Sequence, residues 1–255
     1  MTERARPRPR AATASMPRWI LTCEHASSAV PRAYRSLGLE RRHLRDHIGW
    51  DVGARAVQRE VARRLGAPQV ASRWSRLLVD CNRDPDDPSL ILPASDGVRV
   101  PGNARVSRAE RALRLERYHA PYHAAVDRAV ERELAAARGS ARGEGGRPRE
   151  VRILALHSFT PVMAGKTRRL DIGVLYDAHP KLARALGGAL RELGYRVRYN
   201  QPYSGLAGLI YSARRHGTKH RVAYVELEIN NGLIRTADGV ARIGRDVARA
   251  LRRLS

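Results

Sequence analysis

Polar side chains that could perform chemistry follow or end short apolar runs in this sequence. In chain order they are Glu24 and His25, Asn82 and Arg83, His157, and the pair Glu226 and Glu228. Each apolar run has the length of a buried strand. In open α/β sheets, ligands bind beyond the carboxyl ends of the strands. We therefore expect these side chains to meet in one crevice, in a pattern that suits a metal site with an anion clamp and a general base.

A hydrolytic zinc site needs three protein ligands and one open position for water. His25 and His157 stand at equivalent strand ends and are the first two ligands that we expect. The third should be a carboxylate, for which Asp51 and Glu24 compete. Asp51 precedes a predicted helix, where it could equally serve as an N-cap. Glu24 adjoins His25, but adjacent strand residues point to opposite faces, so we favour Asp51.

The remaining polar residues suggest a substrate clamp and a base. Arg83 can pair with a carboxylate through its planar fork, and Asn82 stands beside it after the predicted strand 77–80. Glu226 and Glu228 share one face of a strand, so only their position along it separates them. Glu228 lies nearer the carboxyl end and is the base that we favour. His119 and His123 flank Pro121, and we expect His123 to reach the pocket.

The elements that must position these residues alternate between strand and helix patterns. The strands are expected at residues 19–23, 77–80, 151–156, 172–176, 196–199 and 223–229. The helices are expected at 52–65, at 180–193, at 238–251, and from the capping box Ser107-x-x-Glu110 to about Ala137, with a kink near Pro121. This alternation predicts a three-layer α/β domain with a mostly parallel or mixed sheet and helices on both faces.

The composition limits the class of protein. The chain has 255 residues with 43% hydrophobic residues, which suffices for one domain over residues 18–255. No apolar run of about 18 residues occurs, the start lacks a secretory pattern, and only two cysteines are present, so we expect a cytoplasmic protein that does not enter a membrane. Residues 1–17 are expected to be a disordered basic tail and residues 138–150 a flexible loop.

Arginine dominates the charge of the chain. The net charge is +23, and 45 of the 48 basic residues are arginines spread over every predicted helix. We interpret this as a solvated surface shaped by compositional bias, and expect a small carboxylate rather than nucleic acid as the partner. The sequence has no G-x-G-x-x-G, P-loop or G-x-S-x-G motif, so dinucleotide, P-loop and serine-hydrolase chemistry lack support.

Several short segments together resemble the N-formylglutamate amidohydrolase family. They are Cys-Glu-His-Ala-Ser-Ser-Ala-Val-Pro (23–31), His-Ile-Gly-Trp-Asp-Val-Gly-Ala (47–54), Ser-Arg-Leu-Leu-Val-Asp-Cys-Asn-Arg (75–83), Tyr-His-Ala-Pro-Tyr-His (118–123), Leu-His-Ser-Phe-Thr-Pro (156–161), Asn-Gln-Pro-Tyr-Ser-Gly (200–205) and Glu-Leu-Glu-Ile-Asn-Asn (226–231). The resemblance runs from about Trp19 to Ile234. It implies a zinc-carboxypeptidase-like fold, zinc as the cofactor, and substrate binding by Arg83, Asn82, His123 and Tyr203.

The resemblance to zinc carboxypeptidases extends to single residues, with one departure. His25 matches their first zinc histidine, and His157 matches the histidine of their H-S-[YF] segment. Their second ligand is a Glu three residues after the first histidine, and Ser28 occupies that position here. The third ligand therefore has to come from elsewhere, and Asp51 is our choice.

Three functions are compatible with this sequence. The first is zinc-dependent hydrolysis of the amide bond of a small N-acyl amino acid, with N-formyl-L-glutamate as the leading substrate. The second is a basic nucleic-acid or polyanion-binding protein with a degenerate site. The third is a metallopeptidase for short acidic peptides that uses the same metal site.

Overall fold

The computed structural model describes residues 16–144, 148–163 and 165–254, and its centre is a six-stranded sheet in the order β2-β1-β5-β10-β8-β9. The strands are β1 (Arg18–Cys23), β2 (Gln69–Ala71), β5 (Val151–Phe159), β8 (Ile172–Leu175), β9 (Val197–Tyr199) and β10 (Ala223–Asn230). Strands β2, β1, β5 and β10 pair in parallel. Strand β8 pairs antiparallel with β10 and parallel with β9, so the sheet is mixed.

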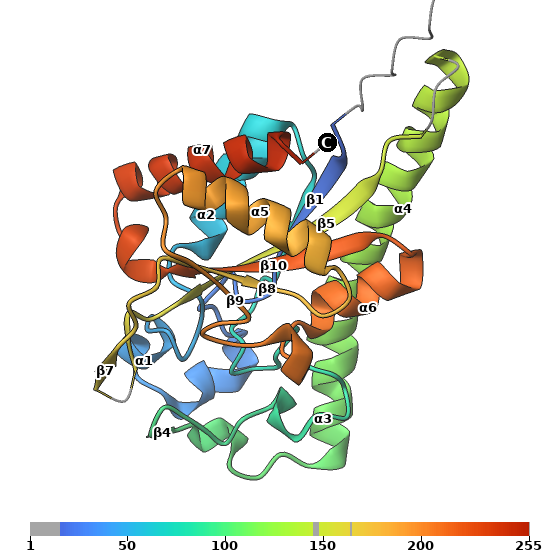
Figure 1. Cartoon of the computed structure of the whole chain (residues 1–255). Helices are drawn as coiled ribbons and strands as arrows, with labels where there is room; N and C mark the ends of the chain where they lie inside the picture. Colours follow the sequence, from blue (N-terminus) through green and yellow to red (C-terminus); the bar gives the residue numbers. More distant parts are fainter. Residues whose placement is uncertain (1–15, 145–147, 164, 255) are drawn as a thin grey trace, which may run out of the picture.

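Helices cover both faces of this sheet, which makes three layers (Figure 1). One face packs against α2 (Ala54–Leu65), α5 (Pro180–Glu192) and α7 (Ala237–Arg252). The other face packs against α4 (Ala120–Glu144) and α6 (Tyr211–His220). Strand residues alternate between the two cores: Leu154 and Leu156 join the first, whereas Ile153 and Ala155 join the second.

Smaller elements gather on the side of the molecule that is lower in Figure 1. They are α1 (Arg41–Leu44), α3 (Arg108–Arg114), and the hairpins β3 (Ala94–Ser95) with β4 (Val98–Arg99) and β6 (Val162–Met163) with β7 (Lys166–Thr167). They belong to the long connections that follow β1, β2 and β5. The carboxyl ends of the parallel strands therefore face a region built from loops, where ligands of such folds bind.

The expected fold class is confirmed, but the strand expected at 77–80 and the helix start expected at residue 52 are wrong. Residues 77–80 form turns rather than a strand, because the backbone N–H groups of Leu78 and Asp80 bond to the carbonyls of Ser75 and Leu90. Helix α2 begins at Ala54, and its N-cap is Gly53, whose φ is +83°. A Cβ at Gly53 would also lie 2.7 Å from the carbonyl oxygen of Ile234. Asp51 is therefore not an N-cap, which leaves its carboxylate for another role.

The region around Pro121 differs in detail from the sequence expectation. The Ser107 hydroxyl accepts a hydrogen bond from the Glu110 backbone N–H, as the capping box predicts. In place of a kink, a π-helical segment, Leu115–His119, joins α3 to α4. A proline in a helix lacks the N–H for its turn, and a π turn accommodates that loss.

The structure describes only part of the expected disordered tail and of the expected flexible loop. Helix α4 continues to Glu144, so the loop expected from residue 138 starts later than predicted. Most of the expected tail, residues 1–15, lies outside the described residues. Within the described chain, no helix combines the length and the hydrophobicity needed to cross a membrane.

Candidate active site

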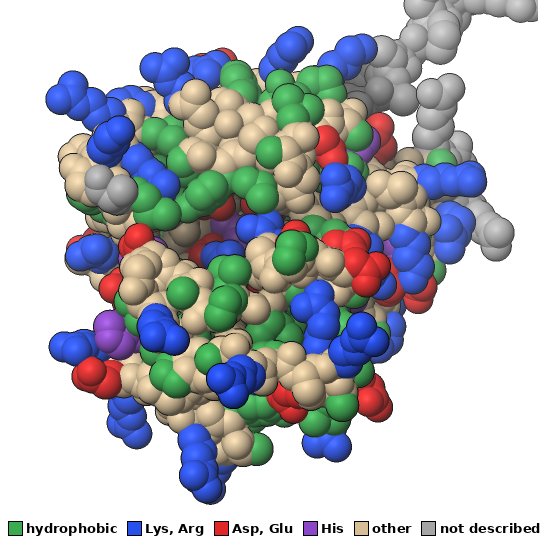
Figure 2. All heavy atoms as spheres, turned by 90° about the horizontal axis from the view of Figure 1, so that it is seen from below, with side chains coloured by type: hydrophobic (Ala, Val, Ile, Leu, Met, Phe, Trp, Pro, Cys, Tyr) green, Lys and Arg blue, Asp and Glu red, His purple; other side chains and the backbone are tan. Residues whose placement is uncertain are grey.

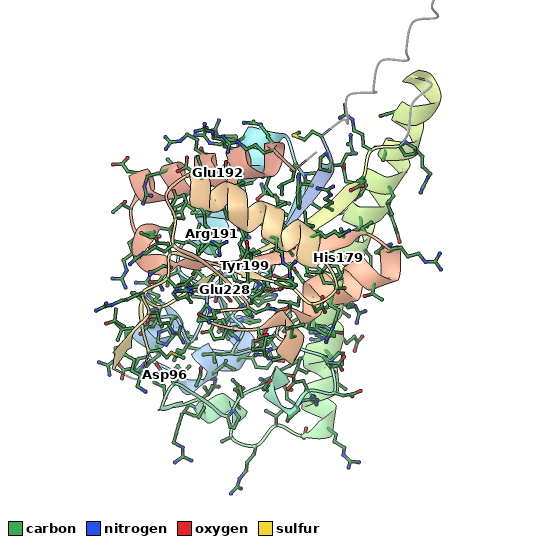
Figure 3. The ribbon with its side chains drawn as sticks, in the orientation of Figure 1. Asp96, His179, Arg191, Glu192, Tyr199 and Glu228 are labelled. Carbon is green, nitrogen blue, oxygen red and sulfur yellow. The ribbon has the colours of Figure 1, made fainter. Side chains whose placement is uncertain are left out.

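A cavity of about 200 Å³ opens at the carboxyl ends of β1, β5 and β10. Its lining residues are His25, His47, Ile48, Asp51, Arg76, Asn82, Arg83, Ser95, Asp96, His157, Ser158, Phe159, Thr160, Met163, Tyr203, Leu209, Glu226 and Glu228. Figure 2 shows a hollow with basic, acidic and histidine side chains inside it, and Figure 3 places Glu228 in the middle of the molecule. Pockets for drug-sized ligands occupy about 300–1,000 Å³, so this cavity suits a smaller molecule.

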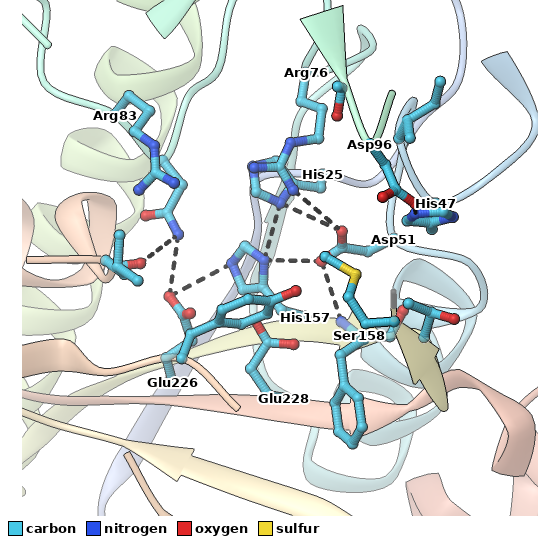
Figure 4. Close-up of a pocket in the computed structure, with 18 residues that line it drawn as sticks. His25, His47, Asp51, Arg76, Arg83, Asp96, His157, Ser158, Glu226 and Glu228 are labelled. Carbon is cyan, nitrogen blue, oxygen red and sulfur yellow. Dashed lines mark hydrogen bonds and ion pairs between the residues drawn. The ribbon is translucent and has the colours of Figure 1, made fainter. Parts of the chain in front are cut away.

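Two histidines and one aspartate converge at one wall of the cavity (Figure 4). The Nδ1 atoms of His25 and His157 lie 3.2 Å apart. The Asp51 carboxylate places Oδ2 at 2.9 Å from His157 Nδ1 and Oδ1 at 3.4 Å from His25 Nδ1. All three residues are buried. The structure thus brings together the three residues that the sequence analysis selected as metal ligands.

A second carboxylate holds the far side of each imidazole ring. His25 Nε2 lies 2.7 Å from Asp80 Oδ1, and His157 Nε2 lies 2.7 Å from Glu24 Oε2. The hydroxyl of Tyr122 in α4 donates to the other oxygen of Glu24 at 2.6 Å. An ionised carboxylate only accepts, so both Nε2 atoms carry protons, and a neutral ring keeps a lone pair on Nδ1. Glu24, the alternative to Asp51, therefore orients His157 from the opposite side of the ring.

Neighbouring basic side chains keep the carboxylates of Asp51 and Asp80 ionised. Burial opposes ionisation of Asp51, but the adjacent His25 holds its pKa below the usual value. Burial also opposes ionisation of Asp80, but His25 and Arg76 hold its pKa well below the usual value. Arg76 contacts Asp80 Oδ2 at 2.8 Å and approaches Asp51 Oδ1 at 3.8 Å. Arg76 thus offsets part of the negative charge that gathers at this wall.

The pKa of His157 is shifted upward, in contrast to the pKa values of the two aspartates. Burial disfavours a charged imidazole, but the surrounding carboxylates, led by that of Glu226, hold the pKa of His157 well above its usual value. The point between His25, His157 and Asp51 is consequently favourable for positive charge. Either a proton or a metal cation satisfies this electrostatic demand.

The two glutamates of β10 differ in their contacts. Glu226 Oε2 accepts from the Asn82 amide at 3.3 Å and lies 3.5 Å from His157 Nε2. Glu228 is the partner of His157 in the β5–β10 register, and its buried Oε2 has no hydrogen-bond partner among the described residues. Burial and nearby Asp51 raise the pKa of Glu228 well above its usual value. Burial also raises the pKa of Glu226, to about 7.

Asn82 and Arg83 line the cavity, although they follow a turn and not a strand. The Asn82 amide group is engaged at both ends: it donates to the carbonyl oxygen of Leu209 and accepts from the backbone N–H of Ser212. The structure shows no ion pair to the Arg83 guanidinium from any residue that it describes. The Arg83 guanidinium is therefore the group of this pair that can bind an anionic ligand.

The two remaining expected substrate-binding residues lie in different places. Tyr203 lines the cavity. His123 does not, because it is buried between α4 and α6, where it contacts His119 and His216. The position of His123 near Pro121 in the sequence does not reveal this burial, because its partner His216 belongs to α6, a helix that the sequence did not predict.

Sequence reasoning also missed two functional side chains. Asp80 and Arg76 both come from the connection that follows β2, and they hold His25 and Asp51. Asp80 belongs to the segment 75–83 that carries the family resemblance, but the sequence pointed to roles only for Asn82 and Arg83. Nothing in the local sequence distinguishes Arg76 from the many other arginines.

Comparisons with known proteins agree with this fold. The family model for N-formylglutamate amidohydrolase matches residues 18–235. The gene product Atu2144 from Agrobacterium tumefaciens is 33% identical, with a TM-score of 0.83 over 93% of this chain and 90% of that chain. The N-formylglutamate amidohydrolase from Ralstonia eutropha JMP134 is 22% identical, with a TM-score of 0.61 over 94% of this chain and 93% of that chain. A comparison with curated proteins gives no significant match.

The fold and the matched family define a hydrolytic enzyme of the mixed α/β class that acts on amides, with residues suited to a metal site. The chain belongs to the N-formylglutamate amidohydrolase family, because the matched segment covers most of its length. The resemblance that the sequence motifs indicated is thereby confirmed.

Proposed function

We propose that this chain is a zinc-dependent amidohydrolase that cleaves the amide bond of a small N-acyl amino acid, with N-formyl-L-glutamate as the leading candidate. One observation carries the proposal: the Nδ1 atoms of His25 and His157 and the carboxylate of Asp51 converge beside Glu228 in one small cavity. Family membership supports hydrolysis of an amide bond.

The residues fit a zinc ion. Around a tetrahedral zinc with Zn–N distances of about 2.0–2.1 Å, neighbouring ligand atoms lie roughly 3.3 Å apart. The Nδ1 atoms of His25 and His157 lie 3.2 Å apart, and Asp51 places one oxygen 2.9 Å from His157 Nδ1 and its other oxygen 3.4 Å from His25 Nδ1. One ligand atom from each of the three residues lies within 4.8 Å of the others. The carboxylates behind both histidines supply the outer contacts that metal-binding histidines usually have. His25, Asp51 and His157 would hold the ion, with the cavity at its open side.

Hydrolysis at this site would combine a zinc ion with proton transfer by a protein side chain. Zinc held at this site would supply a Lewis acid and lower the pKa of water to about 7. Glu228 has a free oxygen at the cavity, so it can take a proton from the attacking water and deliver it to the leaving nitrogen. The C–N bond breaks as the water oxygen joins the acyl carbon, which gives formate and the free amino acid.

Arg83 is the residue that we propose for the substrate's α-carboxylate. A guanidinium can hold a carboxylate through two parallel hydrogen bonds. Asn82 supports it by fixing the loop, because its amide bonds to the chain at both ends. Tyr203 adds an aromatic wall, and the small volume limits the ligand to about amino-acid size.

The test compares Arg83→Ala and Arg83→Lys on N-formyl-L-glutamate and on its α-amide, with zinc present. Two charge-assisted hydrogen bonds contribute roughly 1.5–3 kcal/mol each, so Arg83→Ala should lower kcat/KM for the carboxylate about 100-fold or more. Arg83→Lys should recover part of the loss, since the charge remains but the fork does not. Exposed Arg73, in the same connection, provides the matched control Arg73→Ala.

Two outcomes would contradict the proposal. If Arg83→Ala slows the acid and the amide equally, Arg83 does not select carboxylates. If purified protein shows no zinc and no gain in rate when zinc is added, the metal assignment is wrong.

The alternatives are separated by simple assays. A peptidase would cleave short acidic dipeptides faster than formylated amino acids under the same conditions. A polyanion-binding protein would bind DNA or RNA with an affinity that falls steeply as salt rises. The Lys and Arg side chains in Figure 2 are scattered over the visible face and do not form a stripe, which favours hydrolysis as the function.

A further inference from the structure

A chain of polar side chains links the surface between α4 and α6 to the backbone of the pocket. Asp127 Oδ1 lies 2.8 Å from His216 Nδ1, and His216 Nε2 lies 2.8 Å from His123 Nδ1. His123 Nε2 lies 3.3 Å from His119 Nε2, which in turn lies 3.1 Å from the carbonyl oxygen of Arg83. We call the three histidines with Asp127 the histidine chain. It ends on the residue that we propose as the carboxylate clamp.

The three histidines are neutral. Their exposed fractions are only 1–3%. Burial is the main reason that the pKa of His123 is lowered to about 2, and the neighbouring imidazoles of His119 and His216 add to the effect. Burial likewise lowers the pKa values of His119 and His216. Each ring therefore carries one N–H and one lone pair, so the direction of every hydrogen bond can be assigned.

One assignment of protons satisfies all of these contacts. The Asp127 carboxylate only accepts, so His216 carries its proton on Nδ1 and accepts at Nε2. His123 then donates from Nδ1 and accepts at Nε2. His119 donates from Nε2, and that N–H is shared between His123 Nε2 and the Arg83 carbonyl. In the reversed assignment, His119 Nε2 would be an acceptor and the Arg83 carbonyl would lose its donor.

We infer that the histidine chain positions Arg83 for the substrate carboxylate, an inference that rests on the proposed function of Arg83. The Arg83 backbone is fixed at both ends, because its N–H donates to the Asp80 carbonyl and its carbonyl accepts from His119. Fixing the backbone lowers the entropy that the side chain loses when it binds a ligand. Asp127, His216, His123 and His119 are thus positioning residues that touch no substrate.

A metal site at the outer end of the chain is the competing interpretation. Asp127, His216 and His220 place three ligand-type atoms close together. A metal ion there would displace the proton from His216 Nδ1, so the hydrogen bond from His216 to Asp127 would be lost. Lys219 also forms an ion pair with the other oxygen of Asp127 at 2.7 Å. The cluster is therefore better suited to anchoring the histidine chain.

The test uses three variants at the outer end, which lies outside the pocket. Asp127→Ala removes the acceptor that fixes the His216 proton and should raise KM for N-formyl-L-glutamate about three- to tenfold, as expected for one lost hydrogen bond. Asp127→Asn keeps a side-chain carbonyl that accepts from His216, so KM should stay near the wild-type value. Lys219→Ala removes only the contact with the other oxygen and should also leave KM unchanged. The α-amide substrate should respond to none of the three.

Long-range ¹H–¹⁵N NMR spectra of the whole enzyme report the tautomers directly. The expected wild-type pattern is a proton on Nδ1 of His123 and His216 and on Nε2 of His119. Asp127→Ala should move the His216 proton to Nε2. A different wild-type pattern overturns the inference, as does a tautomer change in Asp127→Ala without a change in KM. An equal rise in KM for acid and amide overturns it too, because that response is general and structural.

Two further results separate this inference from its alternatives. If wild-type enzyme itself does not distinguish the acid from the amide, the proposed function fails, whereas a failure of the inference alone appears only in the variants. A second equivalent of zinc, bound by wild type and lost in Asp127→Ala, overturns the inference in favour of a metal site.

Discussion

Replacing Asp80 by Asn should weaken zinc binding about 10- to 100-fold, the usual cost of losing a partner behind a metal-binding histidine. Asp80 Oδ1 accepts from His25 Nε2 at 2.7 Å, and Oδ2 accepts from Arg76 at 2.8 Å. An asparagine retains an oxygen for His25, but its NH₂ group then faces the Arg76 guanidinium, donor against donor. The lost charge-assisted hydrogen bond contributes roughly 1.5–3 kcal/mol, which corresponds to the stated range.

The assay is a competitive titration of zinc with a chelating dye, run on folded protein whose thermal midpoint has been checked. Asp87→Asn is the matched control, since it removes one negative charge from the same connection, and the Asp87 side chain bonds to Ser89 instead of a histidine. A zinc affinity of Asp80→Asn within twofold of the control would refute the reasoning. Asp80 would then not orient His25, and the assignment of His25 as a ligand would lose its support.

Three other predictions concern turnover, stability and side-chain selection. Glu228→Gln should retain zinc but lose about 10²–10⁴-fold in kcat, measured beside a zinc analysis; unchanged turnover would move the base to Glu226. In α5, Gly188→Ala should raise the free energy of unfolding by about 0.5–1 kcal/mol in urea, because nothing lies within 4 Å of the added Cβ. Gly187→Ala should lower the free energy of unfolding by about 1–3 kcal/mol, because the added Cβ would lie 2.6 Å from a tyrosine ring. Arg168 lies over the ring of the cavity residue Tyr203 at 5.5 Å, and we expect its guanidinium to reach the side-chain carboxylate of the substrate. Arg168→Gln should then raise KM for N-formyl-L-glutamate but not for N-formyl-L-alanine, and equal changes would rule out this contact.

The sequence located the site because apolar runs, and the polar residues that end them, are local features. His25 and His157 stand at the ends of apolar runs that pair in parallel, so their meeting follows from the fold. Asp51 joins them because its backbone N–H bonds to the His25 carbonyl, a contact that no local pattern encodes. The roles of Glu24 and Asp80 depend on which ring nitrogen each one meets, and such orientation exists only once the chain is folded.

The elements that the sequence did not predict have weak local signals. Helix α6, with the sequence YSARRHGTKH, is mostly polar and contains a glycine, yet it forms because its apolar side packs beside α4. Strand β2 has only three residues and depends on β1 for its hydrogen bonds. The run 77–80 is apolar enough for a strand, but its side chains fill small cores among the loops. Tertiary packing decided all three cases.

The number of residues in the π-helical segment Leu115–His119 determines which way the side chains of α4 point. Each residue turns an α-helix by about 100°, so deleting one residue here would rotate the whole of α4 by that angle. Tyr122 would leave Glu24, and His123 would leave His216, in a single step. The far end of α4 projects past the sheet in Figure 1, so a change of length there would leave these contacts in place. Insertions and deletions in this helix should therefore accumulate after the residues that face the sheet, and not before Pro121.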